Sequence, residues 1–108
     1  MSERTNFYLE KLKGNPENLL NRFSLAQTYY ECGEYEQAID HLTICFERRE
    51  DWMMASLLLS KALIAVGQKQ EARQPLEQTI ILAREQGHED PEEEAKALLL
   101  QCAGPDVV

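Results

Sequence analysis

Two side chains, His41 and Cys45, have types and a spacing that could perform chemistry. They stand four residues apart, so on a helix they share one face, one turn apart. Such a pair is half of a metal site, or half of an arrangement in which a histidine activates a thiol. Further ligands are lacking, and Cys45 shares an apolar stripe with Leu42 and Phe46. We therefore expect Cys45 to be a small core residue.

The other candidates for chemistry point the same way. Glu92, Glu93 and Glu94 are adjacent, and adjacent helical positions point in different directions, so the run suits a helix start with solvated charge better than a cation site. His88 precedes it in an expected turn. The glycines are too far apart to form a phosphate-binding loop. The sequence thus predicts no catalytic residue, no metal, no cofactor and no enzymatic activity.

Length and composition suit one globular domain. The chain has 108 residues, of which 44% are apolar and 28% charged, and it has no apolar run long enough to cross a membrane. Nineteen acidic residues stand against eleven Lys and Arg, giving a net charge of −8. This charge repels polyanions, so we expect neither nucleic acid nor a membrane surface as a partner.

The compartment is inferred from the cysteines and the beginning of the chain. The chain has three cysteines, an odd number without motif spacing. We therefore do not expect disulfide bonds to hold the fold together. Residues 1–6 carry no secretory pattern. Both observations favour a cytoplasmic protein.

Helical spacing dominates the chain, and strand patterns are almost absent. After Pro16, one apolar stripe contains Leu25, Tyr29 and Cys32, and a second contains Leu20, Phe23, Gln27 and Tyr30. Both have steps of three and four residues, the period of a helix face. Gly33 then ends the helix, because glycine readily adopts positive φ. A second helix follows with apolar residues from Tyr35 to Phe46.

The chain repeats itself after 34 residues. This shift places Leu25 on Leu59, Gly33 on Gly67, Ala38 on Ala72 and Leu42 on Leu76. Each match is an apolar packing position or the glycine between two helices. The small residues at 38 and 72 allow two helices to approach closely. The period therefore predicts a repeated helix hairpin.

The period and the pattern Leu25-Ala26…Tyr29…Gly33…Tyr35…Ala38…Leu42 resemble the tetratricopeptide repeat. The resemblance covers about residues 5–86. It implies an all-α fold, a right-handed superhelical array of antiparallel helix hairpins with about five helices. Arg22 and Ser56 stand where the family favours Trp, and Lys69 stands where it favours Tyr.

One domain over 1–104 accommodates these segments. We expect 5–14 to be the second helix of a partial repeat, 17–50 the first full repeat, 51–86 the second, and 91–102 a capping helix. Pro75 is expected to kink its helix. Asp90 is expected to cap the last helix, with Pro91 as its first residue and Glu93 completing a capping box. Residues 105–108 are expected to be a disordered tail.

The second apolar stripe carries the functional prediction. In the repeat family, these positions line the concave face, where peptides lie. The resemblance assigns to this partner-binding face Leu20, Phe23, Gln27, Tyr30, Met54, Leu57, Leu58, Lys61 and Ile64. Phe23, Tyr30, Leu57 and Ile64 would be apolar anchors, while Gln27 and Lys61 would give polar selectivity.

The type of partner follows from the same positions. The carboxylate clamp of chaperone-binding relatives is not expected, because Lys61 is the lone charge at the clamp positions. An apolar floor instead suits an apolar or amphipathic peptide or helix of a partner protein. The predicted function is a non-catalytic protein-interaction module.

A structural role is the alternative. The concave face could be filled by a second copy in a homodimer, or by the terminal helices of the chain itself. The protein would then be a self-associating scaffold. The solution mass measured over a range of concentrations separates these two readings.

Overall fold

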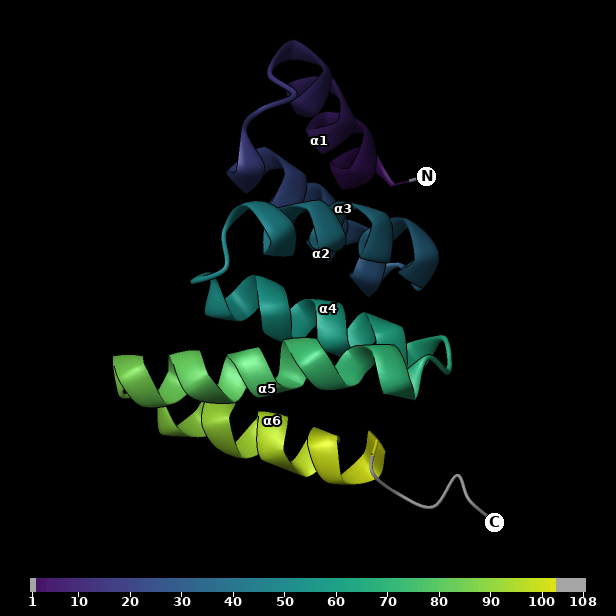
Figure 1. The fold of residues 1–108 in the computed structure, drawn as a ribbon. Helices are drawn as coiled ribbons and strands as arrows, with labels where there is room; N and C mark the ends of the chain where they lie inside the picture. Colours follow the sequence, from purple (N-terminus) through teal and green to yellow (C-terminus); the bar gives the residue numbers. More distant parts are fainter. Residues whose placement is uncertain (1, 103–108) are drawn as a thin grey trace.

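The computed structural model describes residues 2–102, which form a stack of antiparallel helices (Figure 1). In chain order these are α1 (Glu3–Gly14), α2 (Leu19–Glu31), α3 (Tyr35–Arg48), α4 (Met53–Ala65), α5 (Lys69–Gln86) and α6 (Glu89–Cys102). The all-α prediction is confirmed, although the described residues form six helices rather than about five. The two full hairpins account for four, and the flanking segments add one each. The expected tail at 105–108 lies outside the described residues.

Three glycines end helices in the same way. Gly33, Gly67 and Gly87 have φ values of 80°, 83° and 73°, the left-handed region that favours glycine. After α2, the amide of Gly33 donates to the carbonyl of Tyr30, and the amide of Glu34 donates to that of Tyr29. These paired bonds satisfy carbonyls at the helix end. The same pattern follows α4 and α5, so the repeated glycine fixes where each helix stops.

Two helices begin earlier than the sequence pattern indicates. The amide of Thr5 donates to the Ser2 side chain, which caps α1 and moves its start from residue 5 to Glu3. α6 begins at Glu89 rather than 91, so the predicted Asp90 cap is wrong. Asp90 and Pro91 lie in its first turn, where a proline costs little because those amides lack helical partners.

α5 runs through Pro75 as one helix. The helix runs unbroken from Lys69 to Gln86 with the proline inside it, and the kink at this residue stays a prediction. The Pro75 ring is buried, and its carbonyl accepts a hydrogen bond from the Thr79 hydroxyl at 2.8 Å. Proline has no backbone N–H to donate within the helix. Here the buried ring packs in the core at the position where that hydrogen bond is lost.

The core lies along the hairpins and depends on small residues between their helices. Ala38 and Ala72 are fully buried, as are Leu25, Leu42 and Leu76. A methyl group at 38 and 72 lets the paired helices approach closely while the leucines fill the space around them. The burial of the two alanines confirms that both are packing positions, as predicted.

The helices form a linear array in which each packs against its neighbours in the chain. Beyond these neighbours, α2 contacts α4, and α4 contacts α6. α2, α4 and α6 therefore form one layer, with α1, α3 and α5 in the other. α1 and α6 lie at opposite ends of the stack (Figure 1). Among the described residues, no helix is both long and apolar enough to span a membrane.

Candidate functional site

A hollow of about 230 Å³ opens between α2 and α4. We call it the groove. Its lining residues all come from these two helices: Phe23, Gln27, Tyr30, Glu31, Met54, Leu57, Leu58 and Lys61. All except Glu31 belong to the set that the sequence predicts for the partner-binding face. The 34-residue period explains why they meet, since it puts equivalent faces of α2 and α4 side by side.

Two of the predicted residues lie outside this lining. Leu20 is 65% exposed at the beginning of α2. Ile64 is half-buried in the last turn of α4 and packs against the core. The groove therefore includes part of the predicted face, from Phe23 to the end of α2 and from Met54 to Lys61 on α4.

The apolar lining residues differ in how far a ligand could reach them. Leu57 is 4% exposed and belongs to the core, so it forms the floor of the groove. Met54 is 50% exposed at its rim. Phe23, Tyr30 and Leu58 are partly buried against the core. These four side chains, rather than Leu57, are the accessible apolar contacts.

Aromatic side chains support the groove from outside its lining. The Phe23 ring lies 4.9 Å from that of Trp52, and the Tyr30 ring lies 5.3 Å from that of Tyr35. The Arg49 guanidinium lies 5.2 Å from the Trp52 ring. Such contacts hold Phe23 and Tyr30 in place. The sequence did not point to Trp52, because it stands before α4, outside the helical stripes.

Each charged residue of the groove is paired with a terminal helix. The Lys61 ammonium lies 3.0 Å from a carboxylate oxygen of Glu94 on α6. The Glu31 carboxylate accepts a 2.7 Å hydrogen bond from the Arg4 guanidinium on α1, a bond that raises the pKa of Arg4. Sequence reasoning missed both pairs, because the partners lie beyond the two full repeats, where no periodicity fixes their register.

His41 and Cys45 do not form a reactive pair. Nδ1 of His41 is 3.0 Å from Arg22 Nη1, and its ring stacks on that of Tyr29 at 5.9 Å. Cys45 is fully buried, and desolvation raises the pKa of its thiol to about 11, which keeps it protonated and unreactive. Its predicted place in the core is confirmed. Within residues 2–102, no cluster of three His, Cys, Asp or Glu side chains could hold a metal ion.

A larger hollow of about 590 Å³ lies at the turn between α5 and α6. It is open and mostly polar. Arg84 at its edge makes a 2.7 Å ion pair with Glu92, which also pairs with Lys96 at 3.0 Å. The two cations lower the pKa of Glu92. These charges are paired with one another at the edge of a wide surface depression. The lining of this hollow is mostly polar and, unlike that of the groove, has no apolar floor.

The sequence is similar to a family model and to a bacterial protein. The family model described as "Anaphase-promoting complex, cyclosome, subunit 3", a model of the tetratricopeptide type, matches residues 5–79. A protein of Pseudomonas aeruginosa named "TPR repeat-containing protein PA0015" is 36% identical over 92 residues, which are 84% of this chain and 88% of the relative.

Solved structures show the same architecture. The solution structure of protein BPP2914 from Bordetella parapertussis superposes with a TM-score of 0.78 at 27% identity and covers 98% of this chain and 92% of its own. The crystal structure of MamA gives a TM-score of 0.70 at 22% identity, with 91% of this chain and 66% of MamA covered. The MamA likeness concerns the fold alone.

Proposed function

Because the chain belongs to the tetratricopeptide repeat family, whose members are generally protein-interaction modules, we propose that it is a non-catalytic interaction module. Its groove between α2 and α4 binds an apolar or amphipathic peptide or helix of a partner protein. The partner lies across Phe23, Tyr30, Met54 and Leu58. Gln27 offers an amide that can hydrogen-bond to the partner's backbone or polar side chains.

The observation that carries this proposal is the set of accessible apolar side chains that surround the buried floor of a concave hollow. Met54 is half exposed beside partly buried Phe23 and Leu58. Large apolar side chains that meet in a concave surface are typical of binding sites, since covering them removes apolar area from water. An amphipathic helix laid in a groove uses contacts of this kind.

The terminal helices contribute no residue to the lining of the groove. This favours a separate molecule over α1 or α6 as its occupant. The lining residues come from α2 and α4. α1 and α6 reach the groove through Arg4 and Glu94, which pair with its charged residues. A second copy remains the competing occupant, and the experiment below distinguishes it.

The test compares two side chains of equal exposure. Met54 in the groove is 50% exposed, and Ile81 on α5 is 49% exposed. Peptides of 16 residues are selected from a displayed random library against the wild-type protein, and their affinities are then measured by fluorescence anisotropy. Met54→Glu is expected to weaken binding at least ten-fold, because a carboxylate replaces an apolar contact. Ile81→Glu is expected to leave the affinity unchanged.

Two results would contradict the proposal. In the first, Met54→Glu and Ile81→Glu affect binding equally, which would place the binding surface elsewhere. In the second, light scattering over a hundredfold concentration range shows a dimer that Met54→Glu dissociates. The groove would then be the contact between copies, and the scaffold function would replace the partner-binding one. Circular dichroism of both variants checks that their helical content equals that of the wild type.

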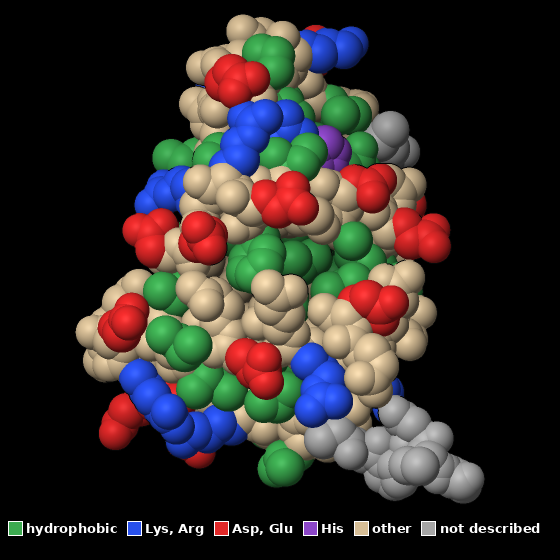
Figure 2. All heavy atoms as spheres, in the orientation of Figure 1, with side chains coloured by type: hydrophobic (Ala, Val, Ile, Leu, Met, Phe, Trp, Pro, Cys, Tyr) green, Lys and Arg blue, Asp and Glu red, His purple; other side chains and the backbone are tan. Residues whose placement is uncertain are grey.

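We further propose that the protein works in the cytoplasm with a protein rather than a nucleic acid or a membrane as its partner. The three cysteines are free, which suits a reducing compartment. The net charge of −8 opposes binding to polyanions. Figure 2 shows one face of the molecule, where acidic side chains are scattered between groups of Lys and Arg.

A further inference from the structure

The groove contains one acidic and one basic residue, Glu31 and Lys61. An unpaired charge in a binding groove selects ligands of opposite charge. The ligand class therefore depends on whether these two charges are free to meet a ligand. Both belong to half-exposed ion pairs with residues outside the groove.

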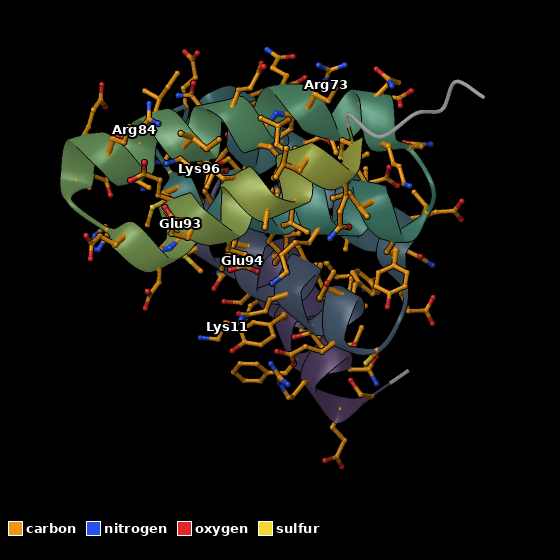
Figure 3. The ribbon with its side chains drawn as sticks, turned by 90° about the horizontal axis from the view of Figure 1, so that it is seen from below. Lys11, Arg73, Arg84, Glu93, Glu94 and Lys96 are labelled. Carbon is orange, nitrogen blue, oxygen red and sulfur yellow. The ribbon has the colours of Figure 1, made fainter. Side chains whose placement is uncertain are left out.

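Lys61 is paired with a carboxylate of the protein itself, at the position that an acidic group of a ligand would take. Glu94 Oε2 lies 3.0 Å from its ammonium, within the range of a charge-assisted hydrogen bond. Glu94 projects from the side of α6 opposite to Lys96 (Figure 3). Because α6 holds Glu94 in place, this carboxylate competes with an acidic ligand at a high effective concentration.

Glu31 is neutralised from the other end of the array. The Arg4 guanidinium on α1 donates to Glu31 Oε1 at 2.7 Å. A basic ligand residue would have to displace Arg4 to reach this carboxylate. The two terminal helices thus supply one opposite charge each, and the ligand-facing remainder is Gln27 with apolar and aromatic side chains.

Building on the groove as the binding site, we propose that it selects segments whose groove-facing residues are uncharged, and that Arg4 and Glu94 determine this selectivity. The occupant is an apolar segment of a partner protein, without Asp, Glu, Lys or Arg at the positions that enter the groove. Charged residues on its solvent side are tolerated. Arg4 and Glu94 are positioning residues that act through Glu31 and Lys61.

The test removes each neutralising charge and reads the ligand class directly. Random 16-residue peptides are displayed and selected against the wild type, Glu94→Gln and Arg4→Gln in about 0.15 M salt, which screens long-range attraction. Glu93→Gln is the matched control for Glu94, because Glu93 pairs with Lys96 instead of a groove residue. Lys13→Gln is the control for Arg4, because Lys13 pairs with Glu10.

The expected result has opposite signs for the two variants. Wild type, Glu93→Gln and Lys13→Gln select peptides with uncharged anchor positions. Glu94→Gln enriches Asp and Glu there, and Arg4→Gln enriches Lys and Arg. For a peptide with one acidic anchor, Glu94→Gln should improve the affinity about two- to five-fold, the range in which half-exposed ion pairs act.

The inference and the proposed function fail in different ways. If groove-dependent peptides are obtained but Glu94→Gln and Arg4→Gln select the same residues as the wild type, the neutralisation has no effect on selectivity. If Glu93→Gln enriches acidic anchor residues as strongly as Glu94→Gln does, the effect comes from the net charge of the protein and the inference is wrong. If the wild type itself prefers charged anchors, the inference is wrong. If Met54→Glu leaves every selected peptide bound, the groove is not the site and the proposed function fails as well.

Discussion

His41 is a half-buried histidine whose protonation the fold opposes. Arg22 Nη1 lies 3.0 Å from its Nδ1, so the guanidinium donates to that nitrogen and the ring proton sits on Nε2. Burial, together with the charge of Arg22, lowers the pKa of His41, against a smaller opposing effect of Asp40. Charging this ring would place two cations in contact.

The lowered pKa makes stability depend on pH in a defined direction. Below about pH 6.5, the ordinary histidine value, the unfolded chain binds a proton at residue 41 that the folded chain resists. The free energy of unfolding is therefore expected to fall from pH 7 to pH 5. In His41→Gln, where nothing titrates at this site, the fall should be smaller. Urea unfolding at a series of pH values measures both slopes.

His88 provides the control for this pH dependence. It is exposed in the turn before α6, so His88→Gln removes a histidine from the chain without changing the surroundings of the His41 ring. A His88→Gln slope reduced as much as that of His41→Gln would show that the proton uptake does not come from the buried ring.

Residue types and spacing predicted most of the residues that line the groove, but not the ion pairs that its charged residues form. Phe23, Tyr30, Met54 and Leu58 follow from helical stripes repeated after 34 residues. The pairing of Lys61 with Glu94 depends on how α6 packs, and α6 is outside the period. The burial of Leu57 to 4% was not evident either, because a stripe gives the direction of a side chain and not the depth of its neighbours.

At the scale of helices, the distance between the two members of a hairpin is set by alanine. Ala38 is fully buried between α2 and α3. Ala38→Leu should destabilise the protein by about 2 kcal/mol, since added methyl groups in a packed core force neighbours apart. Ala65→Leu is the matched change at an exposed site of α4 and should shift stability by about 0.5 kcal/mol or less. Urea unfolding gives both values.

An equal cost for the two variants would contradict this account. It would mean that leucine acts through the intrinsic preferences of the helix, which are the same at both sites. The equivalent change in the second repeat, Ala72→Leu, should resemble Ala38→Leu, because Ala72 is also fully buried.

Helices were predictable where repetition and local chemistry agreed. The repeated glycines at 33 and 67 mark two helix ends correctly. The failures concern where α1 and α6 begin, because single residues were weighed without their surroundings. Pro91 suggested a first helical position, but α6 begins two residues earlier, at Glu89.

At the scale of the whole molecule, the array is bounded by two half-repeats of complementary type. α1 occupies the place of a second hairpin helix, and α6 that of a first. Joining the α6 end of one copy to the α1 end of another would complete a hairpin, and repetition would give an open chain of copies. The residues at the two end faces determine whether this happens.

Long cations stand at these ends where the full repeats have small residues. Aligning α6 with α2 and α4 on its buried Ala95 puts Lys96 where Ala26 and Ser60 are fully buried. On α1, the 34-residue period puts Lys11 in the place of buried Cys45. Lys and Arg side chains gather toward the upper and lower parts of the face shown in Figure 2. A long charged side chain at a position that must pack in the joined hairpin opposes joining, because its charge would have to leave water.

Removing these two cations should promote end-to-end association. Lys11→Ala combined with Lys96→Ala is expected to lower the concentration at which the light-scattering mass rises by at least about five-fold, since taking a charged group out of water costs more than about 1 kcal/mol. The control, Lys13→Ala with Lys69→Ala, changes the net charge equally at exposed sites away from these packing positions. Similar association of both double variants would attribute the effect to overall charge.

The linear packing of the helices also governs how the molecule opens. Because each described helix contacts helices at most two places away in the chain, folding needs few long-range encounters, and such proteins fold roughly within microseconds to milliseconds. The same arrangement lets a terminal helix detach while the central hairpins persist. Each detachment takes Arg4 or Glu94 away and uncovers the charge of Glu31 or Lys61. Fraying of α1 or α6 is thus coupled to the net charge that the groove presents to a ligand.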